Sequence, residues 1–367
     1  MITIENTCNK AIVFADEIDP ATQGLIYAFC GSPVSLGSRL RIMPDAHAGK
    51  GCVIGTTMTL TDKVIPGLIG SDIGCGITAV KFRKNRLELQ QTDKRIREKI
   101  PAGKKIRKHP HRFAEKADLE QLYCKRHIQR DKAYASIGTL GGGNHFIEID
   151  KDRDGAFWLI IHSGSRHLGC EVASFYRELA FRQCDHRVPY EFAFLSGTQM
   201  EEYLKDLAAV QAFAELNRLA IADEIIKGLK LRKEETIQCV HNYIDTEERI
   251  LRKGAISAKK DETVIIPMNM RDGCLIAKGK GNPQWNRSAP HGAGRRMNRL
   301  EARNTFTLSQ YKKEMKGIFS TSVSGNTLDE CPMAYKPPES ILAQIEPTVE
   351  VTERITPIYN FKAGEPI

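Results

Sequence analysis

This sequence of 367 residues has no long apolar run, no closely paired cysteines and no low-complexity linker. No stretch approaches the ~20 consecutive apolar residues that a membrane-spanning helix needs. Residues 1–6 also lack the charged and apolar regions that open a signal peptide. We therefore expect a cytoplasmic protein that does not act on a membrane.

The ten cysteines are scattered singly, and no C-x-x-C pair occurs. In a chain of this length, such spacing argues against a disulfide framework and against a zinc ribbon. Most of the thiols are expected to be small buried hydrophobic groups. Cys75 is singled out, because it follows Asp72 by three residues on a glycine-rich turn.

Several common signatures of nucleotide-binding and hydrolytic enzymes are missing as well. The sequence contains no G-x-x-x-x-G-K-[ST] P-loop, no G-x-S-x-G and no H-E-x-x-H. Residues 43–51, MPDAHAGKG, have the glycines and the lysine (Lys50) of a phosphate-cradling loop. They lack the spacing of a P-loop, so we predict no P-loop here.

Short β-branched runs between glycine turns predict strands at residues 53–60, 77–82, 146–149, 157–161, 263–266 and around 318–319. The clearest helix is expected over residues 198–230, where apolar side chains recur at spacings of three and four. Asn217 and Arg218 lie on it, and we interpret them as part of a solvent-exposed polar face, with a functional role as the alternative. No repeat or linker divides the chain, so we predict a mixed α/β (α+β) fold in a single large domain, residues 1–367.

The formal net charge is +9, from 54 basic and 45 acidic residues. Basic side chains concentrate at residues 81–86 and 104–108. This excess suits a polyanionic partner such as RNA, although a solvated charged face explains either cluster equally well.

Five residues of metal-binding types stand on glycine-rich turns or at strand ends: Asp72, Cys75, His145, His162 and His241. Each is weak evidence alone, because a lone histidine is more often a core or surface residue. Together they match the ligand set of a one- or two-metal centre for hydrolysis or phosphoryl transfer. The thiolate and the imidazoles favour zinc, whereas the carboxylate and a phosphate substrate favour manganese or iron.

His291 lies in the run SAPHGAGRR, residues 288–296. Its glycines allow the backbone to approach a bulky ligand closely, and its two arginines can bind phosphate bidentately. Such a site could hold a nucleotide while the imidazole attacks its phosphorus. For this run alone, a turn with a surface histidine is the alternative.

Taken together, these runs resemble the RtcB family of GTP-dependent RNA ligases. The matching stretches, in the family's order, are MPDAHAGKG, IGSDIGCGI, GTLGGGNHFIEI, IHSGSRHLG, HNYI, SAPHGAGRRMNR and CPMAYK. The combination of GGGNHF, HSGSR and HGAGR is highly specific, and the stretches extend over most of the chain. The resemblance implies an RtcB-like domain of stacked mixed sheets with flanking helices. It also implies an enzyme that uses GTP and manganese, as two ions, to join an RNA 2′,3′-cyclic phosphate or 3′-phosphate to a 5′-hydroxyl.

The same resemblance assigns roles to individual residues. The metal ligands would be Asp72, Cys75, His145, His162 and His241, and His291 would become covalently attached to GMP. Arg295 and Arg299 would hold RNA phosphate. The remaining contacts to the guanine nucleotide would come from Asn144, His145, Glu148, Ser288, Gly292, Ala293, Gly294, Tyr335 and Lys362.

One stretch departs from the family pattern. Residues 266–273, IPMNMRDG, stand where a P-G-S-M-G-type loop is expected, and that loop touches the nucleotide phosphates in the family. We expect Arg271 to replace the backbone donors of the loop and to contact the triphosphate. An ion pair with Asp272 or another surface acid is the alternative.

The chain is also shorter than typical members, which is consistent with a divergent subgroup acting in RNA repair or tRNA splicing. Two other functions are compatible with parts of the pattern. A metal-dependent phosphodiesterase that opens cyclic phosphates without ligation would need the metal ligands but not His291. A non-catalytic RNA-binding relative would keep the basic surface and lose ligands, and none of the expected ligands is lost here.

Overall fold

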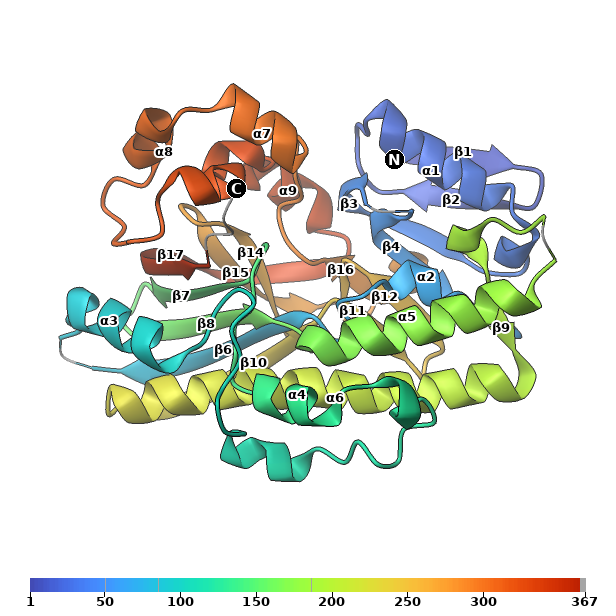
Figure 1. Cartoon of the computed structure of the whole chain (residues 1–367). Helices are drawn as coiled ribbons and strands as arrows, with labels where there is room; N and C mark the ends of the chain where they lie inside the picture. The colour runs from blue at the N-terminus through green and yellow to red at the C-terminus, as the bar shows by residue number, and fades with distance from the viewer. Residues whose placement is uncertain (50, 85, 186, 364–367) are drawn as a thin grey trace.

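Two large β-sheets lie at the centre of the computed structural model, which describes residues 1–49, 51–84, 86–185 and 187–363 (Figure 1). The first sheet has the order β1-β2-β3-β4-β12-β11. Its strands span, in that order, Ile2–Asn6, Asn9–Val13, Leu40–Ala48, Val53–Thr59, Ile250–Lys253 and Asn242–Asp245. The second sheet has the order β10-β6-β8-β7-β17-β15-β14. Its strands span Arg232–Val240, Gly76–Arg83, Phe157–Ser163, Phe146–Lys151, Val349–Lys362, Gly273–Gly279 and Thr263–Asn269.

Two short strand pairs and a set of helices complete the fold. β13 (Ala255–Ser257) pairs with β16 (Ser288–Pro290), and β5 (Lys63–Val64) pairs with β9 (Leu195–Ser196). The α-helices are α1 (Pro20–Cys30), α2 (Pro66–Ile69), α3 (Leu89–Lys99), α4 (Arg130–Ser136), α5 (Arg166–Gln183), α6 (Gly197–Gly228), α7 (Arg299–Thr305), α8 (Leu308–Glu314) and α9 (Pro338–Ile345). The fold is therefore mixed α+β, as the sequence predicts.

The second sheet separates two hydrophobic clusters, because successive side chains of a strand point to opposite faces. On β6, Val80 and Phe82 pack with Ile221 of α6 on one face, whereas Ile77 and Ala79 belong to the cluster on the other face. That other face is closed by the sheet itself, which curls into a half-barrel. The backbone amide of Ile265 on β14 donates to Cys239 Sγ on β10 at 3.2 Å, so the two edge strands meet.

Antiparallel pairing brings the ends of four neighbouring strands of this sheet together. Gly76, at the start of β6, lies opposite Ser163 at the end of β8 and opposite Val240 at the end of β10. Phe146, at the start of β7, lies opposite His162. The residues next to these strand ends therefore converge, and they include the histidines and the cysteine that the sequence singles out.

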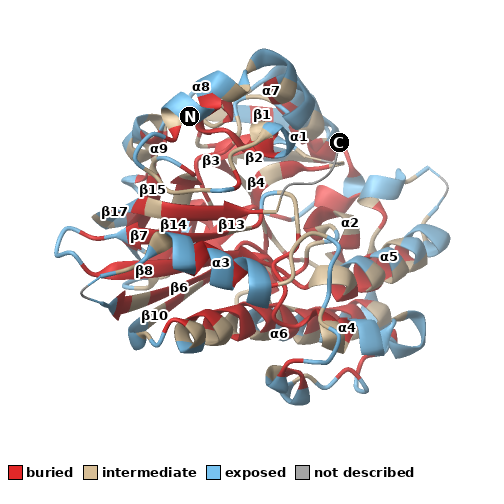
Figure 2. Ribbon diagram, turned by 60° about the vertical axis from the view of Figure 1, so that its left-hand side comes forward, coloured by how far each residue is buried: buried red, intermediate tan, exposed pale blue. Residues whose placement is uncertain are grey.

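The predicted strands and the long helix are confirmed, with one exception. Residues 318–319 form no strand, because Phe319 makes only an isolated bridge to Tyr359 of β17. Asn217 and Arg218 on α6 are fully buried rather than solvent-exposed. Both side chains face the ends of β6 and β8 and form hydrogen bonds there. Figure 2 shows the strands of the second sheet mostly in red, with the largely pale blue helix α3 in front of them. No helix in the described ranges combines the length and apolarity required to cross a membrane.

Candidate metal centre and nucleotide cavity

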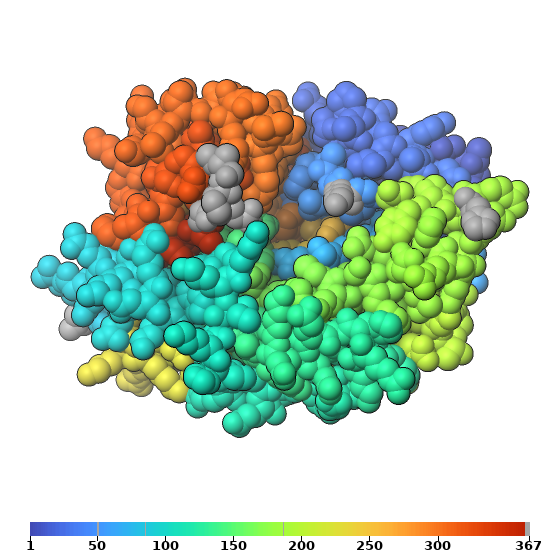
Figure 3. All heavy atoms as spheres, in the orientation of Figure 1, coloured from blue at the N-terminus to red at the C-terminus, as the bar shows by residue number. Residues whose placement is uncertain are grey.

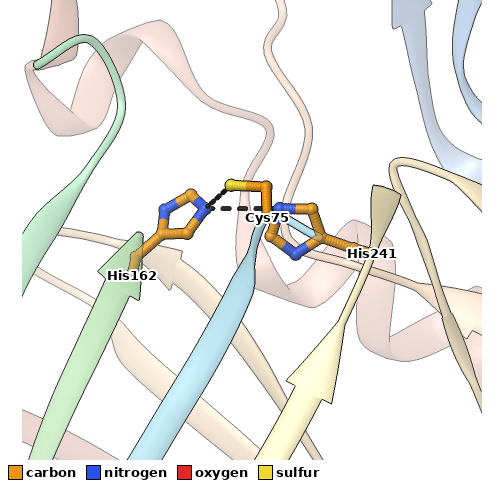
Figure 4. A group of neighbouring side chains, drawn as sticks. All are labelled: Cys75, His162 and His241. Carbon is orange, nitrogen blue, oxygen red and sulfur yellow. Dashed lines mark hydrogen bonds between the residues drawn. The ribbon is translucent and has the colours of Figure 1, made fainter. Parts of the chain in front are cut away.

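The five predicted metal ligands converge at one end of the neighbouring strands β10, β6, β8 and β7 of the second sheet. Cys75 Sγ lies 3.2 Å from His162 Nε2 and 3.4 Å from His145 Nε2. The Nε2 atoms of His162 and His241 are 3.3 Å apart, and Asp72 Oδ2 lies 3.0 Å from His145 Nε2. Figure 4 shows Cys75, His162 and His241 pointing toward one another from the ends of neighbouring strands. The sequence-distant ligands are thus brought together by strand register.

The ligands divide into two groups that share one thiol. Cys75, His162 and His241 form one group, and Asp72, Cys75 and His145 form the other, with ligand atoms within 4.8 Å of one another in each. A thiolate can bridge two cations when it is a common ligand. Each group could therefore hold a divalent cation, and Cys75 would be available to both.

The hydrogen bonds of the histidines show why a cation fits here. His145 Nδ1 lies 2.8 Å from the Leu140 carbonyl, and His162 Nδ1 lies 3.2 Å from the Asn144 carbonyl. Because a carbonyl can only accept, each Nδ1 carries the proton and each Nε2 presents a lone pair. A divalent cation in this cluster would be bound by these Nε2 lone pairs and by the sulfur of Cys75. The donor set of imidazole, thiolate and carboxylate suits a divalent transition metal.

Burial tunes the protonation of these ligands. It lowers the pKa of His162 and of His241 well below the ordinary value, so both imidazoles are neutral and able to bind a metal at neutral pH. Burial alone would raise the pKa of Asp72, but His145 beside it holds that pKa below its usual value. Burial and the Asp72 carboxylate raise the pKa of Cys75, and a bound cation favours the opposite, deprotonated state.

His291 lies beside this centre, and its ring is held by a carboxylate. Its Nδ1 lies 2.6 Å from Asp45 Oδ2, and its backbone amide donates to the same oxygen at 3.2 Å. The ring centroids of His291 and His241 are 4.9 Å apart. Asp45 is fully buried, so it fixes both the tautomer and the orientation of the imidazole. The proton on Nδ1 leaves Nε2 as a free nucleophilic nitrogen.

Gly294 allows this contact to form. Its φ is +74°, and a Cβ at this position would lie 2.3 Å from the carbonyl oxygen of Asp45. Any side chain would therefore push the run after His291 away from the strand that carries Asp45. The glycine predicted to accommodate a ligand also accommodates the positioning carboxylate.

A cavity of about 890 Å³ opens in front of His291. Figure 3 shows the corresponding hollow between the blue N-terminal part and the orange C-terminal part of the molecule. Its volume lies within the range typical of small-molecule sites. Of the predicted nucleotide contacts, those that line the cavity are Asn144, Glu148, His291, Gly292, Ala293, Gly294, Tyr335 and Lys362.

Comparison with known proteins shows the family of this chain. The family model described as tRNA-splicing ligase RtcB matches residues 35–128 and 108–363. The chain belongs to the RtcB family.

Individual relatives cover most of the chain. It is 31% identical over 359 residues to the RNA-splicing ligase RtcB of Escherichia coli K12, covering 85% of this chain and 87% of the relative. It is 27% identical to RNA-splicing ligase RtcB2 of Escherichia coli ATCC 25922, covering 82% of this chain and 81% of the relative. It is also 27% identical to the tRNA-splicing ligase RtcB of Nanoarchaeum equitans, covering 86% and 84%. The chain is therefore an enzyme homologous to RNA ligases. This contradicts the alternative of a non-catalytic RNA-binding relative.

Two residues assigned to the nucleotide by the RtcB resemblance lie elsewhere. Ser288 is fully buried in β16, where its Oγ donates to the Asn286 carbonyl and accepts from Arg252 Nε, so it does not line the cavity. His145 belongs to the metal cluster and is absent from the cavity lining among the described residues. Lys50, the lysine of the cradle-like run, lies outside the residues that the structure describes.

Glu330 is a buried site residue that the sequence motifs do not reveal. It pairs with Lys362 Nζ and accepts from Tyr335 Oη at 2.7 Å. Arg295 and Arg299 also pair with it, at 3.3 and 3.0 Å. Burial would raise the pKa of Glu330, but Lys362 and the two arginines hold it at about 2. The arginines predicted to hold RNA phosphate thus line the cavity while paired with a carboxylate.

A buried carboxylate pair includes Glu148, which lines the cavity. Glu148 and Asp150 occupy one face of β7, and their carboxylate oxygens and Cys274 Sγ lie within 4.8 Å of one another. Asn360 Nδ2 donates to Glu148 Oε2, whereas neither Asp150 oxygen has a hydrogen-bond donor among the described residues. Burial raises the pKa of Glu148 to about 7 and that of Asp150 well above its ordinary value. The pair therefore retains a proton to near-neutral pH.

The divergent loop contributes different residues from those predicted. Met268, Asn269 and Met270 line the cavity, whereas Arg271 is not part of its lining. The Arg271 guanidinium donates to Asp272 at 2.8 and 2.9 Å and pairs with Glu314 of α8. The ion-pair alternative is therefore the one observed, and the predicted contact with a triphosphate is not supported.

Proposed function

We propose that this RtcB family member is a GTP- and manganese-dependent RNA ligase that works through a covalent histidine–GMP intermediate. It would join RNA 3′-phosphate or 2′,3′-cyclic phosphate ends to 5′-hydroxyl ends, in RNA repair or tRNA splicing. The observation that carries this proposal is the position of His291. Its Nδ1 is held by Asp45, and the ring faces a nucleotide-sized cavity beside the cluster of Asp72, Cys75 and three histidines.

In the proposed mechanism, the first chemical step uses this geometry. Nε2 of His291 attacks the α-phosphorus of GTP, the Nε2–P bond forms, and the bond to the leaving pyrophosphate breaks. Asp45 stabilises the ring through its Nδ1 proton as positive charge develops. Manganese held by the two ligand groups would neutralise charge on the phosphate oxygens and orient the reactants. Glu148 and Lys362, which line the cavity, would contact the base.

The later steps use the activated enzyme. The RNA 3′-phosphate displaces His291 from the GMP phosphorus, and this leaves the RNA end linked to GMP. The 5′-hydroxyl of the second strand then attacks the RNA phosphorus, so that a phosphodiester forms and GMP leaves. A 2′,3′-cyclic phosphate must first be opened to a 3′-phosphate by water at the same centre. Arg295 and Arg299, which line the cavity, would exchange Glu330 for an RNA phosphate.

Labelling with GTP tests this function directly. The purified protein is incubated with Mn²⁺ and GTP labelled at the α-phosphate, and adduct mass is measured on the intact chain. We expect a GMP adduct on the wild type and on the control His109→Ala, which changes an exposed histidine, but none on His291→Ala. Metal content should be equal in all three. An adduct that persists in His291→Ala would remove that residue from the mechanism. Opening of cyclic phosphate by a wild type that forms no adduct would instead identify a phosphodiesterase.

A further inference from the structure

Helix α6 places a fully buried amide against two of the turns that carry metal-type ligands. Asn217 Oδ1 accepts from the backbone amides of Gly138 at 2.8 Å and Thr139 at 3.0 Å. Its Nδ2 donates to Ser163 Oγ at 3.0 Å and to the Gly164 carbonyl at 2.9 Å. All four hydrogen-bonding sites of this amide are therefore committed to these two segments.

These segments hold His145 and His162. The Leu140 carbonyl, just after the segment bound by Asn217, lies 2.8 Å from His145 Nδ1 and also accepts from Ser163 Oγ at 2.8 Å. Ser163 directly follows His162 at the end of β8. A shift of the Asn217 side chain would therefore move the backbone groups that orient both imidazoles.

Arg218, the next residue of α6, holds the third turn. Its Nη1 donates to the Gly74 carbonyl at 2.7 Å and to the Ser163 carbonyl at 3.1 Å, and its Nε donates to Thr78 Oγ1 at 3.2 Å. Gly74 directly precedes Cys75. Among the described residues, Arg218 forms no ion pair with a carboxylate, so its buried guanidinium is used on backbone carbonyls and a hydroxyl.

The Cys75 turn rests directly on the helix. Gly74 has a φ of +71°, and a Cβ there would lie 2.8 Å from Ala214 Cβ and 3.0 Å from Gln211 Cα. Gln211 Oε1, on the same helix, accepts from the amide of Ile244 at 3.0 Å on the strand that follows His241. One helix thus fixes all the chain segments that supply the five ligands.

We propose that Asn217 and Arg218 are positioning residues of the metal centre. They hold the segments around residues 74, 139 and 163 at the spacing that lets Cys75 serve both ligand groups. This inference rests on the proposed function, because it assumes that the cluster binds divalent metal. Side chains already held in the binding geometry lose less freedom when a cation binds, so preorganisation raises affinity.

A role in positioning the ligands and a role through charge alone make different predictions for the metal affinity of two conservative variants. Arg218→Lys keeps the positive charge and loses the planar guanidinium, whose Nη1 contacts two carbonyls while its Nε contacts Thr78. Asn217→Asp replaces a single donor group by an oxygen and adds a negative charge beside the Gly164 carbonyl. If these residues acted only through charge, the first variant would bind cations normally and the second more tightly. If they act by position, both variants bind more weakly.

The experiment measures Mn²⁺ affinity of the metal-free full-length chain by electron paramagnetic resonance, without GTP. We expect both variants to bind Mn²⁺ at least tenfold more weakly than the wild type. With Co²⁺ as the probe, the thiolate-to-cobalt absorption should weaken or shift, which reports a displaced Cys75.

Asp206→Asn is the matched control, because Asp206 is another buried polar residue of α6. It binds the amides of Tyr123 and Cys124 rather than a ligand-bearing turn. Its Mn²⁺ affinity and cobalt spectrum should match the wild type even if its melting temperature falls.

The outcomes separate this inference from the proposed function. Wild-type affinity and an unchanged cobalt spectrum in both variants would overturn the positioning role. Normal binding by Arg218→Lys together with tighter binding by Asn217→Asp would replace it with a charge effect. Should Arg218→Lys fail to fold, Asn217→Asp decides alone, because it is nearly isosteric. A wild type that binds neither metal would refute the metal centre itself, and the proposed function would fall with it.

Discussion

Asp45 illustrates what a single buried carboxylate does for the site. It is 246 residues from His291 in the chain, yet its Oδ2 contacts both the ring and the backbone amide of that residue. We predict that Asp45→Asn slows GMP transfer to the enzyme by roughly 10²–10⁴-fold, because an amide that donates to Nδ1 would move the ring proton to Nε2. The initial rate of adduct formation measures this. Metal content should stay unchanged, and a rate within threefold of the wild type would show that Asp45 does not set the tautomer.

Glu148 should make stability depend on pH in a defined direction. Its pKa is raised by burial from 4.5 to about 7, so its contribution to stability is fully present below pH 4.5 and is lost as the pH rises through 7. Glu148→Gln removes the contribution of Glu148 to this dependence. We therefore predict that the free energy of unfolding of the variant, relative to the wild type, increases between pH 4.5 and pH 8. Urea unfolding at both pH values tests it, and parallel pH profiles would contradict it.

The ligand types could be predicted from the sequence, whereas their partners could not. Asp72, Cys75 and the histidines stand in short runs whose composition is unusual in itself. Asp45 stands in such a run too, but its lysine and glycines suggest phosphate binding, and nothing local points to His291. Glu330 gives no local signal, because its role arises only when β17 brings Lys362 beside it. Pairings made by tertiary packing leave little trace in local spacing.

Helix α6 shows the same limit at the scale of an element. Its periodicity predicts the helix nearly to the residue, Gly197–Gly228 against an expected 198–230. The same periodicity places polar residues toward solvent, and this interpretation of Asn217 and Arg218 is wrong. This helix of 32 residues passes the turns at the ends of the strands. Backbone groups of those turns have no partner within the sheet, so they require polar side chains. Only the sheet topology reveals that requirement.

The hairpin of β14 and β15 carries a prediction about the divergent loop. Arg271, in the turn between these strands, pairs with Asp272 and with Glu314 of α8 rather than facing the cavity. We predict that Arg271→Ala changes the rate of adduct formation by less than about threefold. The loss of partly exposed ion pairs should cost less than about 1 kcal/mol of stability. Parallel assays with GTP and with RNA that already carries a 3′-guanylyl end would test this, and a selective defect with GTP would restore the triphosphate contact.

At the scale of the whole molecule, the site unites distant parts of one chain. The first sheet supplies Asp45, the second sheet and its edge supply the metal-type ligands, and β17 supplies Lys362 near the C-terminus. Because ligands and cavity residues come from both sheets, we propose that residues 1–367 fold as a single domain. The motif order predicts that these segments cooperate, but the half-barrel that joins them depends on long-range strand pairing.

Metal binding should therefore stabilise the entire fold. A ligand that binds only the native state adds about 2.7 kcal/mol of stability at a concentration one hundred times its dissociation constant. We predict that Mn²⁺ raises the melting temperature of the wild type in a single cooperative transition. Cys75→Ser should lose most of this increase, because Cys75 belongs to both ligand groups and an alcohol is a far poorer ligand than a thiolate. Cys8→Ser is the control, since the Cys8 thiol hydrogen-bonds with Thr7 and the Gly31 carbonyl and lies far from the ligands in the chain. Calorimetry with and without Mn²⁺ distinguishes the variants. An equal increase in Cys75→Ser and the wild type would exclude Cys75 as a shared ligand, and two separate transitions would refute the single domain.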